Sequence, residues 1–224
     1  MTQKTTGDHL LAIAKAGLSA VPYVGGTLAS LIGDYIPTHT QRSIERFLAE
    51  LAKRLERLEG RLDPETIDRD EFAELFKSCY LVAVRTHQGE KLRAAAGILS
   101  NLLLRQDDPL RLSYTELDHF SRCVDVLSTG AINVLVEAYR LGQSLGRPGD
   151  DDPRFNFEDL GKRLPGMTPE LLMGLVGELN AMNLVHLAGV PGIRTTHYAN
   201  YPVELTGLGT RFVRQILDET ALRS

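Results

Sequence analysis

The segment TPELLMGLVGELNAMNLVHL, residues 168–187, contains the change of periodicity that decides the fold class. Its first residues, Thr168 and Pro169, are typical of a helix N-cap followed by proline at the first helical position. The apolar side chains that follow recur at helical spacing, namely Leu171, Leu172, Leu175, Val176, Leu179 and Met182. Leu184 to Leu187 then predicts a strand. A helix that leads directly into a strand indicates a mixed module at this end of a helical chain.

The segments on either side of residues 168–187 complete the pattern of this module. The predicted elements are a short helix (157–164), a turn (165–166), the helix and strand above, a glycine and proline loop (188–200), a returning strand (203–205) and a closing helix (207–217). This order resembles a winged helix-turn-helix, and VELTGLGTRFVRQI, residues 203–216, resembles the passage from wing to last helix in that fold. We therefore expect a winged-helix-like domain at 156–224, with a two-stranded wing that carries the only strands.

The chain before this module has the apolar periodicity of packed helices. The predicted helices are Gln41 to Glu59, Asp70 to Thr86, Gln88 to Arg105, a helix that ends near Leu127 after a Ser113/Glu116 capping box, and Ala131 to Leu141. On the first of them the predicted apolar seam is Ile44, Leu48, Leu51, Leu55 and Leu58. Residues 142–155 concentrate Gly, Pro and Asp, which predicts a linker. The expected fold is mainly α, with a multi-helix bundle at 1–141 joined by this linker to the winged-helix module.

The first part of the bundle sequence is LLAIAKAGLSAVPYVGGTLASLIGDYI, residues 10–36, which contains no formal charge between Lys15 and Asp34. About 18 helical residues would span only ~27 Å, against ~30 Å for a bilayer core. Proline and paired glycines in the middle predict a hairpin of two short arms. Its marker residues are Ala12, Ala16, Ala20, Pro22, Gly25, Gly26, Ala29 and Gly33. Small residues at this spacing favour close helix packing, so the hairpin is expected either to pack inside the bundle or to engage a membrane or a partner.

The overall composition excludes some classes of protein. A net charge of −4 and a pI near 5.9 give no general attraction to nucleic acid or anionic lipid. The two cysteines, Cys79 and Cys123, lie within apolar helical patterns without paired spacing, which favours neither a disulfide scaffold nor a zinc site. The polar first nine residues do not resemble a secretory signal. We expect a cytoplasmic protein, peripheral to the inner membrane if the hairpin acts there.

The sequence contains no recognisable motif of a catalytic, cofactor-binding or metal-binding site. Gly25-Gly26 lacks the Lys-Ser/Thr of a phosphate loop, and none of the histidines forms an HExxH pair (His9, His39, His87, His119, His186 and His197). His87 with Gln88 and Glu90 is the most site-like cluster, but it falls between two helices, where capping explains the same residues. Asp150 to Asp152 suit a solvated spacer, and neither cysteine has a recognisable local base. The sequence therefore predicts a non-enzymatic protein without cofactor or metal.

The winged-helix resemblance raises the question of DNA binding. The residues that could contact DNA are Lys162, Arg163, Asn180, Asn183, Arg194 and Arg211. The segment from Pro169 to Asn183 contains Glu170 and Glu178 but no Lys or Arg, whereas a recognition helix normally presents basic side chains to the DNA. We therefore expect the module to contact protein or a second copy of the chain, with a DNA-binding transcription regulator as the alternative.

One sequence family resembles this chain over most of its length. The segment Arg85-Thr86-His87-Gln88, followed by Glu90-Lys91, together with the small-residue N-terminus and the winged-helix-like tail, is similar to a group of uncharacterised bacterial proteins, some in mobile or defence-associated settings. This resemblance implies an architecture and assigns no catalytic residue. Residues 10–36 also resemble the glycine-rich N-terminal helices of membrane-permeabilising effectors. Together these features predict an interaction protein that acts on a protein partner or a membrane.

Overall fold

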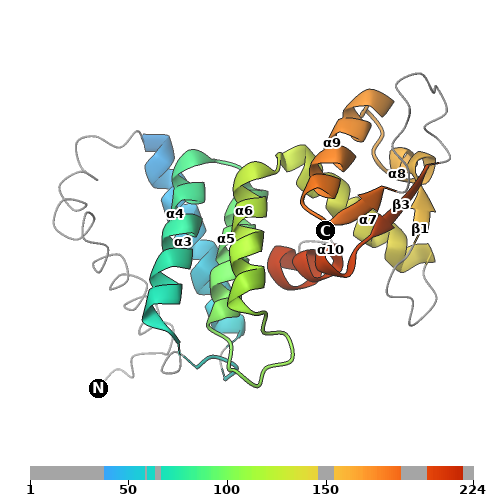
Figure 1. Ribbon diagram of the computed structural model, residues 1–224. Coiled ribbons are helices and arrows are strands. Elements are labelled where there is room, and N and C mark those ends of the chain that lie inside the picture. The colour runs from blue at the N-terminus through green and yellow to red at the C-terminus, as the bar shows by residue number, and fades with distance from the viewer. Residues whose placement is uncertain (1–37, 59, 64–66, 146–153, 188–200, 219–224) are drawn as a thin grey trace, which may run out of the picture. The chain divides into compact units, whose positions relative to one another are not determined.

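A computed structural model describes residues 38–58, 60–63, 67–145, 154–187 and 201–218 (Figure 1). The chain is mainly helical, with a small three-stranded antiparallel sheet. It divides into two compact units, the first of which ends at Asp125 and the second of which begins at Val126. The predicted hairpin at 10–36 lies outside the described residues. Within the described ranges, no helix combines the length and the apolar character that a membrane crossing requires.

Four helices of the first unit are described: α3 (Thr38–Arg57), α4 (Arg69–Arg85), α5 (Gly89–Leu102) and α6 (Tyr114–Val126). The segments that follow α3 and α5 pair with each other through an antiparallel bridge between Leu62 and Leu104. The amide of Arg105 donates to the carbonyl of Arg61 at 2.8 Å, beside this bridge. The C-termini of α3 and α5 therefore lie at the same end of the bundle, while the short turn from α4 to α5 makes those two helices antiparallel.

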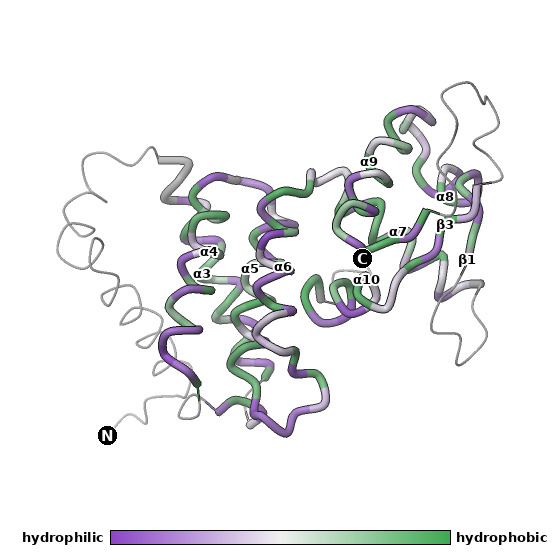
Figure 2. Tube along the Cα trace, in the orientation of Figure 1, coloured by the Kyte–Doolittle hydropathy of each residue, from purple (hydrophilic) through white to green (hydrophobic). Residues whose placement is uncertain are grey.

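Helix α5 forms the centre of this bundle because its residues from Ala94 to Leu102 are all buried. The run Ala94-Ala95-Ala96-Gly97 has small side chains, which allow neighbouring helices to approach closely. Helices α3 and α4 both pack on α5. Figure 2 shows that apolar and polar stretches alternate along the helices of the bundle, as expected for helices with one buried face.

The starts of two helices follow from local capping. Asp68 caps α4, since its Oδ1 accepts hydrogen bonds from the amides of Asp70 at 2.9 Å and Glu71 at 3.0 Å. The predicted capping box before α6 is confirmed, because the Glu116 amide donates to Ser113 Oγ at 3.3 Å and the Ser113 amide to Glu116 Oε2 at 3.4 Å. On α3 the buried apolar residues include Leu51 and Leu55 of the predicted seam, together with the fully buried Phe47, which the seam omitted.

A bidentate ion pair joins the segment that follows α3 to the segment that follows α5. Arg61 donates from Nε to Asp108 Oδ2 at 2.8 Å and from a terminal nitrogen to Oδ1 at 2.7 Å, and the Leu110 amide donates to Oδ1 at 2.9 Å. Only 6% of the Asp108 side chain is exposed, against 40% of Arg61. The hydrogen bonds from Arg61 lower the pKa of Asp108 below its ordinary value of 3.8.

This ion pair predicts a pH-dependent contribution to stability. A carboxylate whose pKa is lowered by folding stabilises the protein above its unfolded pKa, and that stabilisation disappears as the pH falls through the folded pKa. The difference in free energy of unfolding between wild type and Asp108→Asn should therefore have its full size near pH 6 and shrink as the pH falls below the unfolded pKa of about 4 and then through the lower folded pKa. Urea denaturation at a series of pH values measures it, and a difference that is constant with pH would contradict the assignment.

The second unit begins with α7 (Thr129–Leu145), followed by β1 (Arg154–Asn156), α8 (Phe157–Arg163), α9 (Pro169–Ala181), β2 (Val185–Leu187), β3 (Pro202–Leu205), α10 (Gly207–Arg211) and a π-helix (Phe212–Asp218). The strand order is β1-β3-β2, and both pairs are antiparallel. Phe155 and Leu187 both lie opposite the fully buried Val203, so this register directs one face of the sheet toward the core.

The structure corrects the sequence prediction at the start of this unit. The predicted linker at 142–155 is replaced at one end by the last turn of α7, which continues to Leu145, and at the other by β1, which begins at Arg154. The sheet therefore has a third strand beyond the predicted two-stranded wing. Phe155 is the physical reason, since it is only 4% exposed and β1 extends the sheet along β3. The boundary between units lies at Asp125/Val126, one helix earlier than predicted, because α7 packs on α8, α9 and β1.

Candidate interaction surface on helix α9

Helix α9 is held in place by a local cap and by one apolar face. The Thr168 Oγ1 accepts a hydrogen bond from the Leu171 amide at 3.3 Å, and Pro169 occupies the first turn, as the sequence predicts. The apolar face of the helix is buried and contains Leu172, Leu175, Val176 and Leu179. The packing of this face fixes which side chains of α9 point outward.

The outward face of α9 carries little charge. Its exposed residues are Glu170, Leu171, Gly174, Gly177, Asn180 and Ala181. Leu171 is 52% exposed, one of four large apolar residues of the described chain that are exposed. Neither Lys nor Arg occurs anywhere between Pro169 and Ala181. This face therefore offers apolar and backbone surface without basic groups.

The two glycines on this face have no packing reason within the described residues. A Cβ built on Gly174 or Gly177 would meet no described atom within 4 Å, and neither residue has a positive φ. Glycine in a helix interior costs about 1 kcal/mol relative to alanine. The missing side chains instead leave the backbone of α9 open to close approach by another molecule.

Glu178 has a structural role that the sequence does not reveal. Its Oε2 accepts a hydrogen bond from the Ser128 amide at 2.9 Å and its Oε1 accepts one from the Ser128 hydroxyl at 3.2 Å. The Ser128 hydroxyl in turn accepts from the Ala131 amide at 3.1 Å, so Ser128 and Glu178 together cap the start of α7. From the sequence, the Glu178 carboxylate was interpreted only as a negative charge that would repel DNA. Its hydrogen-bond partner Ser128 could not be foreseen, because it lies 50 residues away along the chain.

The two asparagines predicted as DNA contacts have local roles in the fold. Asn180 Oδ1 accepts a hydrogen bond from the Leu187 amide at 3.1 Å, which ties α9 to β2. Asn183 has a φ of 55°, a left-handed conformation that ends the helix and turns the chain toward β2. Its carbonyl accepts a hydrogen bond from the Thr206 hydroxyl at 2.7 Å.

The predicted cationic contacts lie on other elements. Lys162, at the end of α8, pairs with Glu158 at 3.2 Å and with Asp159 at 3.5 Å, and its hydrogen bond with Glu158 raises its pKa. Arg163 donates to the Ser144 hydroxyl at 3.2 Å, and Arg211 lies at the end of α10. Arg194 lies outside the described residues. The structure therefore places the described cations of this set on α8 and α10, and none of them on α9.

Helix α10 supports the junction between α9 and β2. The Thr206 hydroxyl donates to the Leu184 carbonyl at 3.0 Å and accepts a hydrogen bond from the Gly209 amide at 2.9 Å. Gly209 is buried, and a Cβ at this position would lie 2.0 Å from the Leu184 carbonyl oxygen. This contact brings the backbone of α10 directly against the residue that precedes β2.

A cysteine–histidine pair in the first unit was missed by the sequence analysis. His119 Nε2 lies 3.4 Å from Cys123 Sγ, so the inference that neither cysteine has a local base is wrong. The signal was available, since the residues are four apart on α6 and therefore share a helix face. Cys123 is nevertheless fully buried, and burial raises its pKa to about 11; burial also raises the pKa of Cys79. Both thiols are protonated near neutral pH, which argues against a nucleophilic role.

The residues around His87 make local contacts at the turn between α4 and α5, but the side chain of Gln88, the N-cap residue of α5, makes no capping hydrogen bond. The Thr86 hydroxyl accepts a hydrogen bond from the Gln88 amide at 3.1 Å, and Glu90 pairs with Arg93 at 3.4 Å. His87 itself is exposed at the turn between α4 and α5. Within the described ranges, no three His, Cys, Asp or Glu side chains are placed to hold a metal ion. Asp150 to Asp152 lie outside those ranges.

Comparison of the chain with protein-family models, with curated proteins and with solved structures finds no match. The resemblance to defence-associated bacterial proteins therefore stays a prediction from the sequence.

Proposed function

We propose that the second unit is a winged-helix module that contacts protein, and that the chain is a non-enzymatic interaction protein. The order of elements supports the winged-helix arrangement, since α7, β1, α8, α9, β2 and β3 follow one another as in that fold. The strand order β1-β3-β2 also supports it, because it places the strand between the first two helices beside the last strand. In this arrangement α9 occupies the position of the recognition helix.

The observation that carries the proposal is the outward face of α9. A helix that reads DNA presents Arg, Lys, Asn or Gln to base edges and needs nearby cations for the phosphates. The α9 face instead presents Leu171, Gly174, Gly177 and Ala181, and the side-chain oxygen of Asn180 is engaged by β2. Apolar side chains and open backbone suit a protein partner that packs closely, such as an apolar helix.

A titration with DNA separates this proposal from the transcription-regulator alternative. We expect no change in the fluorescence anisotropy of a labelled random-sequence duplex with up to roughly 50 μM protein at 20 mM NaCl, because non-specific binding depends on phosphate neutralisation. A saturable rise that weakens with salt and is lost in an Arg163→Glu/Arg211→Glu variant would establish the regulator instead.

The two glycines give a prediction in which stability and binding move in opposite directions. Gly174→Ala and Gly177→Ala should each raise the free energy of unfolding by about 0.5–1 kcal/mol, because alanine favours the helix and finds open space. The same substitutions should weaken partner binding by obstructing close approach. Thermal and urea denaturation measure the first effect, and a loss of stability in either variant would show that the fold itself needs the glycine.

The N-terminal hairpin adds a second part to the proposed function. Residues 10–36 are proposed to engage a membrane or a partner, on the support of their uncharged, small-residue sequence alone. Liposome flotation and dye release with the full chain test the membrane case. Gly25→Leu and Gly33→Leu should reduce both signals, whereas a wild-type chain that neither floats nor releases dye contradicts membrane engagement.

A further inference from the structure

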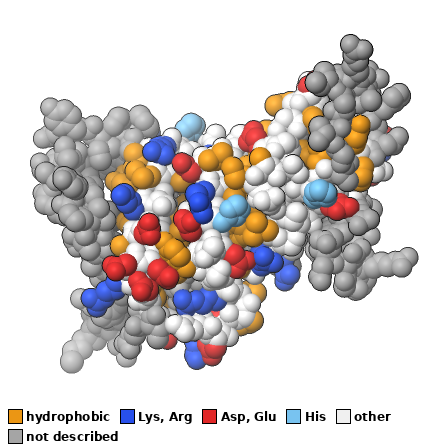
Figure 3. Space-filling view, in the orientation of Figure 1, with side chains coloured by type: hydrophobic (Ala, Val, Ile, Leu, Met, Phe, Trp, Pro, Cys, Tyr) orange, Lys and Arg blue, Asp and Glu red, His pale blue; other side chains and the backbone are white. Residues whose placement is uncertain are grey.

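In the first unit, helices α5 and α6 pair exposed or half-exposed cations with carboxylates of the same helix. Arg93 pairs with Glu90 at 3.4 Å on α5, and Arg122 pairs with Asp118 at 2.6 Å on α6. Figure 3 shows Lys and Arg side chains interspersed with Asp and Glu side chains on one face of this unit. On these helices the chain neutralises its own cations.

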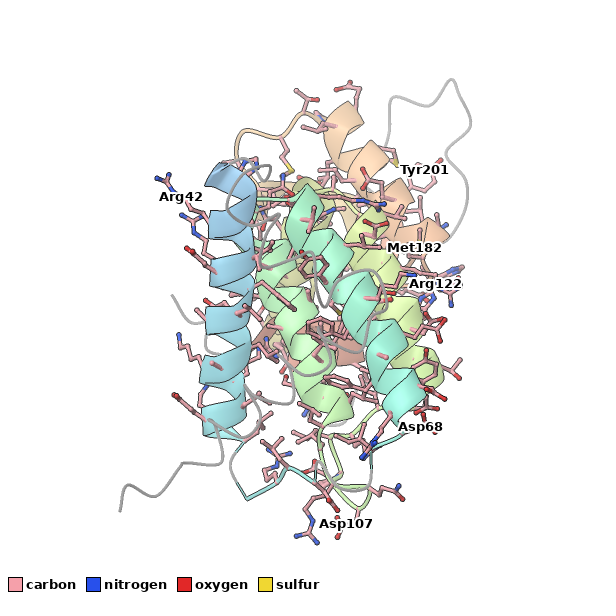
Figure 4. The ribbon with its side chains drawn as sticks, turned by 90° about the vertical axis from the view of Figure 1, so that its left-hand side faces the viewer. Arg42, Asp68, Asp107, Arg122, Met182 and Tyr201 are labelled. Atoms are coloured by element: carbon pink, nitrogen blue, oxygen red, sulfur yellow. The ribbon has the colours of Figure 1, made fainter. Side chains whose placement is uncertain are left out.

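Helix α3 has a different arrangement on its exposed side. Arg42, Arg46, Ala49, Lys53 and Arg57 are all exposed, and each follows the one before it by three or four residues. Residues at this spacing lie along one stripe of a helix. Figure 4 shows Arg42 pointing away from the bundle near one end of α3. We call these five residues, four cations and one alanine, the α3 basic stripe.

The carboxylates of α3 lie outside the α3 basic stripe. The helical period of 3.6 residues places the exposed Glu45 and Glu56 on one side of it and the half-buried Glu50 on the other. Helix α3 as a whole carries five cations and three carboxylates, whereas the net charge of the chain is −4. The positive charge of α3 is therefore concentrated on its exposed stripe.

Neither ion pairing nor the helix dipole accounts for the α3 basic stripe. Among the described residues, Arg42, Arg46 and Lys53 take part in no ion pair. The dipole favours cations in the last turn of a helix, which explains Arg57 but not the cations of the first half. Like charges four residues apart, such as Arg42 and Arg46, destabilise a helix. These charges therefore weaken the helix that carries them, which indicates a binding role.

The length and position of the α3 basic stripe suit a membrane surface. From Arg42 to Arg57 it extends about 22 Å along the helix. Lipid headgroups present many negative charges in one plane, and each Lys or Arg near an anionic leaflet strengthens binding about fivefold. Residues 10–36, which the sequence predicts to engage a membrane or a partner, are separated from α3 only by Pro37. The stripe therefore lies directly after the segment that would enter the membrane.

We propose that the α3 basic stripe binds the headgroups of an anionic membrane. This inference rests on the proposed membrane engagement of residues 10–36, and it names the class of lipid that the chain selects. One apolar anchor gives only marginal, reversible binding, and stable attachment takes a second signal such as a basic patch. The uncharged part of residues 10–36 falls short of the ~30 Å bilayer core, so it needs such a second signal.

Nucleic acid is the other polyanion that a row of cations could bind. The net charge of −4 opposes binding to both kinds of polyanion. On a membrane, burial of the uncharged residues between Lys15 and Asp34 offsets this repulsion, whereas nucleic acid offers no apolar phase to receive them. The stripe and the segment before it together favour a lipid surface.

Vesicle flotation with the whole chain tests this proposal. At about 50 mM NaCl the wild type should bind phosphatidylcholine vesicles that contain about 30% phosphatidylglycerol at least about 30-fold more tightly than vesicles of phosphatidylcholine alone. The difference should shrink at about 500 mM NaCl, because salt screens exposed charges. Arg42→Gln/Arg46→Gln/Lys53→Gln should reduce binding to the anionic vesicles about 100-fold, since three cations contribute about fivefold each.

A matched variant separates the α3 basic stripe from net charge. Arg69→Gln/Lys77→Gln/Arg122→Gln removes the same charge from exposed positions of α4 and α6. It should reduce binding to the anionic vesicles by less than about threefold, because these groups would lie away from the headgroups. Equal losses of binding in the two triple variants would overturn the proposal.

The same flotation experiment distinguishes failure of this inference from failure of the proposed function. Equal binding of the wild type to neutral and anionic vesicles would overturn the role of the α3 basic stripe and leave membrane engagement by residues 10–36 in place. Binding to neither kind of vesicle would overturn both. Binding of labelled duplex DNA that the α3 triple variant abolishes would overturn the proposal in favour of nucleic acid.

A fluorescence measurement with all charges intact locates the face that touches the membrane. A bimane label on Ala49→Cys lies within the α3 basic stripe, and one on Thr115→Cys lies at an exposed position of α6. The native Cys79 and Cys123 are buried and should escape labelling. Anionic vesicles with a nitroxide on a headgroup should quench the label on Ala49→Cys and not the one on Thr115→Cys. Equal quenching of both labels, or quenching at Thr115→Cys alone, would overturn the proposal.

Discussion

Gly209→Ala is expected to cost the second unit more than about 3 kcal/mol of stability, or to prevent it from folding. The added Cβ would lie 2.0 Å from the carbonyl oxygen and 2.9 Å from the carbonyl carbon of Leu184, both backbone atoms. That carbonyl also accepts hydrogen bonds from the amide and hydroxyl of Thr206, so relieving the clash breaks the junction with β2. A flexible side chain could yield at such a contact, but a hydrogen-bonded backbone cannot.

Gly207→Ala is the matched control for this prediction. It lies on the same short helix, and its Cβ would meet only the end of the Arg211 side chain at an ordinary 3.6 Å. We expect this substitution to change stability by less than about 0.5 kcal/mol. Hydrogen exchange at the amides of β2 and β3 measures the local loss, and wild-type protection in Gly209→Ala would contradict the close approach of α10 to Leu184.

Asn101→Leu is expected to destabilise the first unit by about 2–4 kcal/mol. Asn101 is only 4% exposed, its Nδ2 donates to the Leu110 carbonyl at 2.8 Å and its Oδ1 accepts from the Leu112 amide at 2.8 Å. A leucine of similar size would fill the space but leave both backbone groups without this partner. The loop between α5 and α6 would then lose its connection to the bundle.

Two further substitutions serve as comparisons for Asn101→Leu. Asn101→Asp keeps an acceptor for the Leu112 amide but, when ionised, has no donor for the Leu110 carbonyl, so it should destabilise the unit most at a pH where the carboxyl is ionised and least where the protonated carboxyl can donate its O–H. Asn133→Leu, at an exposed position of α7, should change stability little. Urea denaturation and the exchange rate of the Leu112 amide measure the series. Equal stability of wild type and Asn101→Leu would contradict the role of this side chain.

The sequence predicted the features that depend on neighbours along the chain. Helical periodicity located α4, α5, α6 and α9, and the Ser113/Glu116 box and the Thr168-Pro169 cap were found because their partners are three residues away or fewer. A cap of this kind can be recognised from the local sequence. These elements are confirmed, although α5 ends before the predicted Arg105.

The sequence did not predict features that depend on distant partners. A three-residue strand such as β1 is too short to show a period, and its partner β3 lies more than forty residues away. The capping of α7 by Glu178 and the burial of Phe47 and Asn101 are equally non-local. The sequence pattern of one helix or strand does not show which residues far away along the chain will pack against it or form hydrogen bonds with it.

The sequence shows that the α9 surface lacks basic side chains, but it does not show what the individual residues of that surface do. The absence of Lys and Arg from residues 169–183 pointed to protein contact, and the structure adds that Gly174 and Gly177 face open space. The sequence offered Asn180 and Asn183 as base-reading side chains, whereas the fold uses Asn180 to hold β2 and Asn183 to end the helix. These roles depend on the strand that follows the helix.

Photo-crosslinking from α9 in the native host cell is the most direct test of protein contact through this helix. A benzophenone amino acid at Leu171, which is 52% exposed, should form a discrete protein adduct on irradiation, and the same probe at the exposed Asn133 of α7 should not. Adding Gly174→Ala and Gly177→Ala should reduce the adduct severalfold. Adducts with nucleic acid, equal adducts at both positions, or none at Leu171 would contradict the proposed function.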